Sequence, residues 1–290
     1  MDGILNLNKP AGFTSFDCVA IVRRLTGERK IGHTGTLDPQ ATGVLPLCLG
    51  KATRLLEYMD DRPKTYICEC VLGLVTDSRD IWGTVESDVR GKTGFISREN
   101  IEEVLDSFKG EISQKPPVFS AIKVNGKKLY QYAREGRSVE IPERRVTIHS
   151  IKLLEWNGCE KPFTFEVKCS RGTYVRSICH DLGQKLGCGA AMSGLMRTET
   201  CGYVIDNAVD LAALREMSPE EIGKLLDPLE TAVSTLPYMS LSGKKAKLFK
   251  NGNPVWSEGL RCPDEAYAVF EGGKLLGIAK GPKVSKVIPE

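Results

Sequence analysis

The chain begins with alternating apolar and polar side chains that predict a strand over residues 4–8, and this period of two returns at three later places. Alternation is typical of a strand that buries one face. The later segments are Thr65–Leu72, Arg145–Ile151 and Phe163–Cys169. A hairpin from the strand over 65–72 is expected to return near Gly83–Val85. The chain therefore contains sheet along much of its length.

Apolar side chains spaced three and four residues apart predict helices between these strands. The stripe Cys18, Val19, Val22 and Leu25 follows a capping Thr14 or Ser15 and ends at Gly27. Further helices are expected over 51–59, 97–109, 126–134 and 173–186, with two short ones over 211–226.

From about residue 237 the pattern changes to short apolar pieces between glycines, such as 268–270 and 273–279. This change predicts a small β-rich module joined through residues 228–237. Strands and helices mix without a regular β-α-β order. The pattern therefore favours an α+β fold over a doubly wound parallel sheet.

Composition is that of an ordinary soluble globular protein, because 41% of the 290 residues are hydrophobic and 27% are charged. No apolar run approaches the roughly 20 residues that cross a bilayer. The N-terminal residues lack the charged lead and apolar core of a signal peptide. We therefore expect a cytoplasmic protein.

Ten cysteines are scattered from Cys18 to Cys262, and several lie inside apolar runs. No C-x-x-C pair occurs, so neither a zinc site nor a thioredoxin-like site has support. We expect reduced and mostly buried thiols.

The net charge of +3 does not by itself imply a nucleic-acid partner, but basic residues gather in one span with aromatic rings between them. A solvated helix face is the plain interpretation of such a span. Rings that stack on bases and cations that meet phosphates make RNA contact the alternative. The residues considered for RNA contact are Lys123, Lys127, Lys128, Tyr130 and Arg134.

The segment His33–Pro46 places one carboxylate, Asp38, between two turns of small residues. Gly35 and Gly43 permit backbone angles closed to other residues, and Pro39 fixes the dihedral directly after the acid. A loop of this kind costs conformational entropy and buries little. It is therefore expected to aim the Asp38 side chain.

Several chemistries for this loop fail on particular residues. The segment ending in Gly50–Lys51 resembles a phosphate-binding P-loop, but that motif needs glycine where Leu45 stands and a hydroxyl where Ala52 stands. No G-x-S-x-G occurs for serine hydrolysis. No cluster of histidines or carboxylates surrounds the loop in sequence for a metal. A carboxylate that acts as nucleophile or base without a metal remains.

A second segment, Cys169–Ile178, places Tyr174 and Arg176 at an expected strand-to-helix junction. At such an edge both side chains can reach one cleft, where an arginine can pair with a carboxylate and keep it ionised. The alternative is a surface arginine on a helix and a tyrosine in the core. Spacing alone does not decide between them.

The chain resembles the TruB family of bacterial tRNA pseudouridine-55 synthases, and the resemblance extends along nearly its whole length. The segments that carry it are Leu7–Gly12, Gly32–Pro39 with Ala41–Gly43, Lys64–Tyr66, Ser120–Lys123, Gly126–Tyr130, Gly172–Arg176, Asp181–Gly183, Gly194–Arg197 and Lys250–Val255. It implies a catalytic domain over 1–230 on a mixed, largely antiparallel sheet. It also implies a small PUA-like RNA-binding domain over 236–290.

The same resemblance implies the roles of individual residues. Asp38 matches the family's catalytic aspartate, Arg176 its partner, and Tyr66 the ring that stacks on the target base. Tyr174, Leu195 and His33 match residues that line the pocket or hold the displaced nucleotide. Lys9, in the matched Leu7–Gly12 segment, joins the RNA-contact residues named above.

The expected activity is isomerisation of uridine-55 in the tRNA T loop by base flipping, with no cofactor and no metal. We expect a monomer that needs tRNA but no membrane or obligate protein partner. A tRNA-binding or tRNA-folding chaperone without essential catalysis is the alternative. A catalytic subunit of a guide-RNA ribonucleoprotein is a third possibility, which predicts basic tails that are not seen before Glu290.

Overall fold

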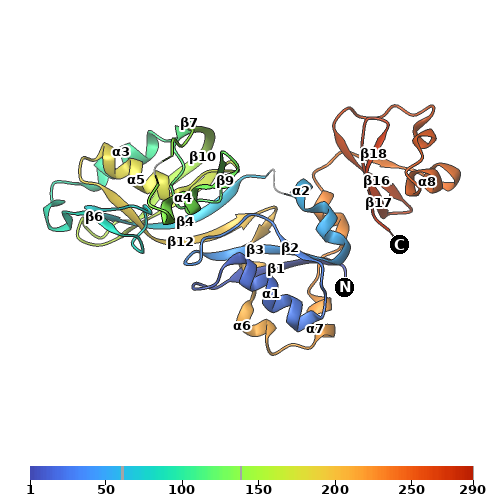
Figure 1. Ribbon diagram of the computed structural model, residues 1–290, viewed down its shortest axis with the longest axis horizontal. Coiled ribbons are helices and arrows are strands. Elements are labelled where there is room, and N and C mark those ends of the chain that lie inside the picture. The colour runs from blue at the N-terminus through green and yellow to red at the C-terminus, as the bar shows by residue number, and fades with distance from the viewer. Residues whose placement is uncertain (60–61, 138, 290) are drawn as a thin grey trace. The chain divides into compact units, whose positions relative to one another are not determined.

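A computed structural model describes residues 1–59, 62–137 and 139–289. The chain forms two compact units that are interlaced along the sequence (Figure 1). Unit 1 contains Met1–Pro39, Leu45–Asp60 and Asn207–Glu290, and unit 2 contains Gln40–Val44 and Asp61–Asp206. No described helix is long and apolar enough to cross a membrane.

In unit 1 the sheet order is β14-β1-β3, with β1 and β14 parallel and β2 paired antiparallel with β3. Helix α1 packs against this sheet through Cys18, Val19 and Val22. Its N-cap is Thr14, one of the two caps expected from the sequence, in a capping box with Asp17. The elements of this part are β1 (Gly3–Lys9), α1 (Ser15–Thr26), β2 (Ile31–His33), β3 (Thr42–Leu49), η1 (Gly50–Leu55), α2 (Leu56–Met59), β14 (Val209–Asp210), α6 (Leu211–Leu214), α7 (Pro219–Lys224) and η4 (Leu229–Val233).

The C-terminal part of the chain builds a separate four-stranded sheet with its own core. Phe249 and Trp256 meet edge to face in that core, with ring centroids 5.1 Å apart, and Tyr267 is fully buried beside them. The elements are β15 (Tyr238–Ser240), α8 (Gly243–Lys250), η5 (Pro254–Ser257), β16 (Ala266–Glu271), β17 (Lys274–Lys280) and β18 (Lys283–Val287). The small β-rich module is thus confirmed, whereas its boundary at 230–236 stays a prediction.

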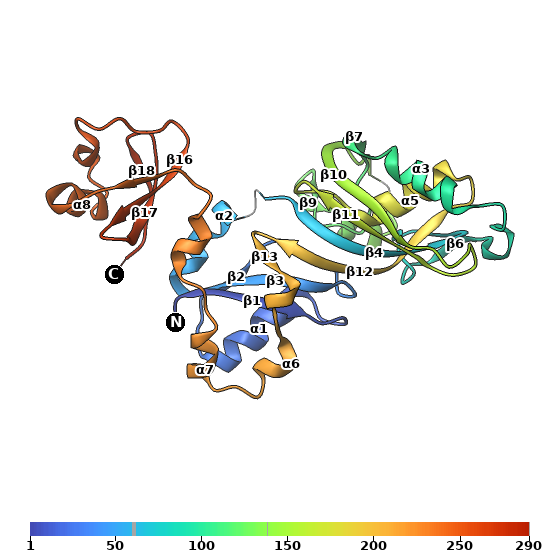
Figure 2. The ribbon, with the colours of Figure 1, turned by 180° about the vertical axis from the view of Figure 1, so that it is seen from behind.

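Unit 2 is built on a sheet in the order β12-β4-β11-β10-β7, and all these neighbours run antiparallel. The first residues of β3 add a parallel edge to β12. Helices α3 and α5 pack on one face, as both views show (Figures 1 and 2). The elements are β4 (Lys64–Leu72), α3 (Arg98–Asp106), β7 (Gly110–Gln114), β10 (Arg144–Glu155), β11 (Phe163–Cys169), α5 (Val175–Lys185), β12 (Ala190–Thr200), β13 (Tyr203–Val204) and, after it, the 3₁₀ helix η3 (Ile205–Asn207).

Two hairpins of unit 2 differ from the sequence expectation. The strand near residue 85, β6 (Val85–Asp88), pairs with a separate short strand, β5 (Leu74–Thr76), and not with β4. The short 3₁₀ helix η2 (Arg90–Lys92) follows it. The expected helix over 126–134 begins only at Leu129, as α4 (Leu129–Arg134), because Lys127–Lys128 forms β9 against β8 (Lys123–Val124). Asn125 and Gly126 join these strands with φ of 51° and 80°, a tight turn typical of the Asn-Gly pair.

The α+β class with a mixed, largely antiparallel sheet and a small C-terminal β unit is therefore confirmed. The cysteines are also mostly buried as expected, since only Cys159 and Cys262 are partly exposed.

Candidate active site

The carboxylate-bearing loop of unit 1 is fixed directly before Asp38. The Leu37 backbone N–H donates a hydrogen bond to Ser15 Oγ at 2.9 Å. The Ser15 hydroxyl in turn donates a hydrogen bond to the Leu37 carbonyl oxygen at 3.3 Å. Ser15 is the first residue of α1 and is buried. Because Leu37 is buried as well, the backbone entering Asp38 is held against the helix.

Lys9 holds the same loop directly after Asp38. Its ammonium donates hydrogen bonds to the carbonyl oxygens of Pro10 at 2.9 Å, Phe13 at 2.6 Å and Pro39 at 3.0 Å. Its side chain is 0% exposed. A buried ammonium is tolerated only when such acceptors replace its water. The charge of Lys9 is therefore used inside the loop, and the contact of Lys9 with RNA stays a prediction.

His33 is the last residue of β2 and opposes Leu47 of β3. The next residue, Thr34, donates its backbone N–H to the Pro46 carbonyl oxygen at 3.1 Å. Gly35 then takes a φ of 70°, the left-handed angle that the sequence predicts for it. His33 thus stands where the strand gives way to the Asp38 loop.

Tyr66 and Leu195 share one face of the unit 2 sheet. Tyr66 and Cys68 are two residues apart on β4 and point to the same side, and Leu195 opposes Cys68 in the register of β12. Cys68 Sγ lies 3.5 Å from Cys179 Sγ of α5, so this side is the one that α5 covers. The structure therefore brings two predicted pocket residues onto the α5 side of the sheet.

Tyr174 and Arg176 do lie at a strand-to-helix junction, as the sequence predicts. Tyr174 is the N-cap residue of α5, five residues after β11 ends. Its backbone is held by the Gln114 side chain, which accepts from the Tyr174 N–H at 2.8 Å and donates to the Tyr174 carbonyl oxygen at 3.1 Å. A two-point amide contact of this kind fixes both the position and the direction of the helix start.

Arg176 is buried, with only 5% of the residue exposed. Its guanidinium donates to the carbonyl oxygens of Ser78 at 3.2 Å and Phe119 at 3.0 Å. One of its nitrogens also lies 3.6 Å from Asp80 Oδ2. The interpretation of Arg176 as a surface helix residue is therefore wrong. Its pairing with Asp38, which belongs to the other unit, stays a prediction.

Sequence reasoning missed Asp80, the carboxylate that meets Arg176. Asp80 Oδ1 accepts hydrogen bonds from Ser78 Oγ at 2.6 Å and from the Trp82 N–H at 3.1 Å. The other carboxylate oxygen of Asp80, Oδ2, is the one that faces the Arg176 guanidinium. The only signal in the sequence is the polar turn chemistry of residues 76–84, which is common in loops.

Arg197, in the Gly194–Arg197 segment, is a further buried residue near the site, with 1% of it exposed. It opposes Tyr66 of β4 on one side and Gly43 of β3 on the other, and its Nε donates to the Val44 carbonyl oxygen at 2.8 Å. A charged side chain buried in this way ties the start of β3 to the strand that carries Leu195.

The predicted RNA-contact residues lie together on the β8–β9 hairpin and α4. The Lys128 ammonium and the Arg134 guanidinium lie 5.6 and 5.4 Å from the centre of the Tyr130 ring, and Lys127 lies 5.0 Å from that of Tyr132. Lys123 is exposed at the start of the hairpin. Cation–π contacts keep these charges beside rings, and Lys127 also pairs with the Glu135 carboxylate.

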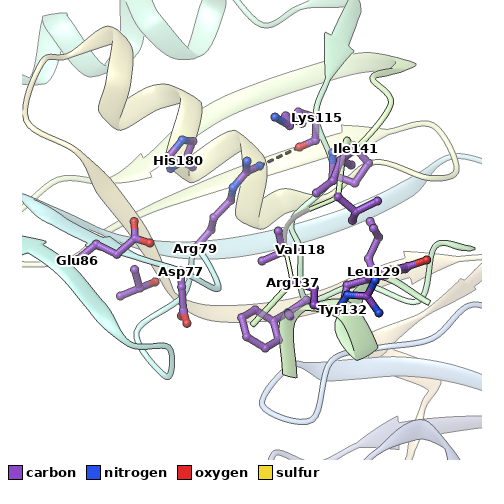
Figure 3. A pocket seen from close by; sticks show the side chains of 15 residues that line it. Asp77, Arg79, Glu86, Lys115, Val118, Leu129, Tyr132, Arg137, Ile141 and His180 are labelled. Atoms are coloured by element: carbon purple, nitrogen blue, oxygen red, sulfur yellow. Dashed lines mark hydrogen bonds between the residues drawn. The ribbon is translucent and has the colours of Figure 1, made fainter. Parts of the chain in front are cut away.

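A cavity of about 420 Å³ lies between this region, the turn after β5 and helix α5. Figure 3 shows Arg79 reaching across it toward Lys115, with Glu86 on one side and Tyr132 on the other. Burial lowers the pKa of Arg79 and of His180 on its wall. Among the described residues, no group of three or more His, Cys, Asp or Glu side chains could hold a metal ion.

Comparison with known proteins gives one consistent family. A family model described as TruB family pseudouridylate synthase (N terminal domain) matches residues 23–175, and one described as tRNA pseudouridylate synthase B C-terminal domain matches residues 176–234. The tRNA pseudouridine synthase B of Geobacillus thermodenitrificans is 48% identical over 87% of this chain and 85% of its own. That of Clostridium kluyveri is 41% identical over 96% of this chain and 95% of its own.

A chain of the crystal structure of a Cbf5–Nop10–Gar1 complex superposes with a TM-score of 0.72 at 25% identity, over 99% of this chain and 85% of that one.

Proposed function

Because the chain belongs to the TruB family of pseudouridylate synthases, we propose that it isomerises uridine-55 in the T loop of tRNA, with Asp38 as its catalytic carboxylate. The observation that carries the assignment of Asp38 is the anchoring of its loop on both sides. Ser15 holds Leu37 before it and Lys9 holds Pro39 after it. A backbone held on both sides of Asp38 restricts where its carboxylate can lie, which lowers the cost of orienting it for a reaction.

The reaction is an isomerisation that balances without a cofactor. The bond between N1 of uracil and C1′ of the ribose breaks, the base turns in the pocket, and a bond between C5 and C1′ forms. The proton on C5 leaves and N1 gains a proton. Nothing is oxidised and no group is lost. The base must first leave its stack, since no side chain reaches it inside a helix.

The remaining site residues divide the work of holding that base. Tyr66 stacks on the flipped uracil, a contact worth about 1–3 kcal/mol per base, and Leu195 closes the apolar side of the pocket. Arg176 keeps Asp38 ionised, since a protonated acid can neither attack nor accept a proton. Tyr174 stands beside the base, and His33 holds the displaced nucleotide. The placement of Tyr66 and Leu195 on the α5 side of the sheet supports this division.

RNA contact beyond the pocket is assigned to two regions. The first is the β8–β9 hairpin with α4, where Lys123, Lys127, Lys128, Tyr130 and Arg134 would meet the T stem-loop. The second is the C-terminal domain over 236–290. The protein is proposed to act in the cytoplasm, as a monomer without a protein partner.

The test compares purified wild type with Asp38→Asn on a T stem-loop RNA, scored for pseudouridine. Asp106→Asn is the matched control, because Asp106 is an exposed carboxylate at the end of α3 that pairs with the exposed Lys109. We expect full conversion by wild type and by the control, and none by Asp38→Asn with unchanged RNA affinity. Product formed by Asp38→Asn would end the catalytic assignment.

The same assay separates the two other functions. A tRNA-folding chaperone would bind the RNA and leave uridine intact in the wild-type reaction. A subunit of a guide-RNA assembly, such as the Cbf5 complex that shares this fold, would need added protein or RNA. Conversion by the isolated chain excludes both.

A further inference from the structure

One arginine outside the predicted site joins the neighbours of the buried Arg176–Asp80 pair. Arg79 Nη1 donates hydrogen bonds to Ser177 Oγ at 2.6 Å and to the Lys115 carbonyl oxygen at 2.8 Å. Ser177 Oγ in turn donates to the same carbonyl oxygen at 3.0 Å. These three contacts close a triangle between the turn after β5, the chain after β7 and the first turn of α5. Figure 3 shows the arm of Arg79 that reaches Lys115.

Two residues of this triangle are the direct sequence neighbours of the Asp80–Arg176 ion pair. Arg79 directly precedes Asp80, and Ser177 directly follows Arg176. A single hydrogen bond therefore links the neighbours of both members of the ion pair. Arg176 reaches in the opposite direction, from α5 to the Ser78 carbonyl oxygen. Two arginines thus connect the same turn and the same helix from both sides.

The backbone of Arg79 is held in a conformation that side chains rarely adopt. Its φ is +65°, a left-handed value unfavourable for a residue with a Cβ. Tertiary contacts maintain it, since the Arg79 carbonyl oxygen accepts from the Met192 N–H at 3.1 Å and the Ile81 N–H donates to the Met192 carbonyl oxygen at 3.0 Å. The angle at Arg79 decides where the next residue, Asp80, points.

We propose that Arg79 is a positioning residue, which sets the distance and direction of Asp80 and Arg176 and thereby the rate of the isomerisation. This inference rests on the proposed function. Its surroundings distinguish it from ordinary packing, because Arg79 lies on the wall of the 420 Å³ cavity beside Glu86 and His180. Removing its side chain leaves space for a small cation at the same acceptors.

The cavity makes chemical rescue the decisive experiment. Arg79→Asn removes the guanidinium and keeps a residue type that tolerates a left-handed backbone, whereas Arg79→Lys keeps a charge with a different reach. Conversion is measured in single turnovers at saturating T stem-loop RNA. We expect Arg79→Asn to be roughly 10–100-fold slower, the loss that a displaced positioning group causes, and Arg79→Lys to be intermediate. Millimolar guanidinium ion should restore part of the Arg79→Asn rate, and equal urea should not.

RNA affinity is measured separately, with each substitution in an Asp38→Asn background. We expect the dissociation constant to change little, because Arg79 acts through protein groups. The matched control is Arg90→Asn, which removes an exposed arginine paired with Asp88 at the opposite end of the β5–β6 hairpin and should leave rate and affinity unchanged.

Three results would overturn the inference. Arg79→Asn could convert RNA at the wild-type rate, or its defect could vanish at saturating RNA with a raised dissociation constant, which would make Arg79 an RNA contact. It could also unfold at a lower temperature with no response to guanidinium, which would make its role structural. Failure of the proposed function is distinct, because wild type itself would then form no pseudouridine.

Discussion

The ammonium of Lys9 donates a hydrogen bond to the Pro39 carbonyl oxygen, 3.0 Å away and one residue beyond Asp38. A cation at the end of the first strand thus fixes a loop thirty residues later. Three backbone carbonyl oxygens accept hydrogen bonds from this ammonium, so the structure gives it a role in holding the loop.

Replacing this buried cation should therefore cost stability first. We expect Lys9→Met to lower the free energy of unfolding by about 2–4 kcal/mol, since carbonyls lose a charged donor and stay buried. Lys123→Met, at an exposed lysine of the β8–β9 hairpin, should leave stability unchanged and lower the slope of RNA affinity against salt by about one. Urea unfolding and RNA binding at several salt concentrations measure the two effects. The reverse pattern would support Lys9 as an RNA contact.

The buried pair of Asp80 and Arg176 predicts a second large effect. Asp80→Asn keeps the polar shape and removes the charge, so Arg176 is left with its charge partly uncompensated at 3.6 Å. We expect a loss of about 3 kcal/mol in the free energy of unfolding and slower conversion. Asp88→Asn, in an exposed pair with Arg90, should change stability little. Equal unfolding midpoints for the two variants would contradict this prediction.

The contact between Gly43 and Arg197 predicts the effect of a single methyl group. A Cβ on Gly43 would lie 2.2 Å from the Arg197 carbonyl oxygen, at a φ of +100°. Gly126, in the β8–β9 turn, has a φ of +80° but open space around it. We expect Gly126→Ala to cost about 1 kcal/mol from backbone strain alone, and Gly43→Ala more than about 3 kcal/mol. If Gly43→Ala and Gly126→Ala lowered the thermal stability by similar amounts, β3 and β12 could move apart to accommodate the methyl group at no cost.

His180 predicts a pH dependence of stability. Burial, and then the positive charge of Arg79, lower the pKa of His180 from its usual 6.5. The unfolded chain then binds this proton more readily than the folded protein. Stability is therefore complete above pH 6.5 and is lost as pH falls from 6.5 through the lowered folded pKa. Compared with His180→Gln, wild type should lose stability in that window, as followed by urea midpoints. If the urea midpoints of wild type and His180→Gln changed equally with pH, this contribution of His180 would be excluded.

The sequence predicts those helices and strands whose pattern is set by residues close to one another in the chain. The helix over 15–26 and the strands over 64–72 and 163–169 have a regular period and clear ends, so their pattern reflects one buried face. The strand over 190–200 went unpredicted. It lies between β3 and β4, and its register shifts near Gly194, so it shows no simple alternation.

The residues of the candidate site likewise fall into those that their neighbours in sequence mark and those that only distant contacts define. Asp38, Tyr174 and Arg176 lie in local contexts, a loop of small residues and a helix start, that mark them in sequence. Asp80 acquires its role only through a helix nearly a hundred residues later, and Lys9 through a loop that folds back upon it. Neither partner is visible from the residues beside it.

Interlacing of the two units also governs when the protein can fold. Strand β1 is synthesised well before its parallel neighbour, which places Val209 opposite Leu7. The nascent chain must therefore carry an open strand edge while all of unit 2 is being made. Pairings of such long sequence separation form slowly, and an unpaired edge invites wrong partners. Unit 1 is thus begun before unit 2 is synthesised and is completed only after it.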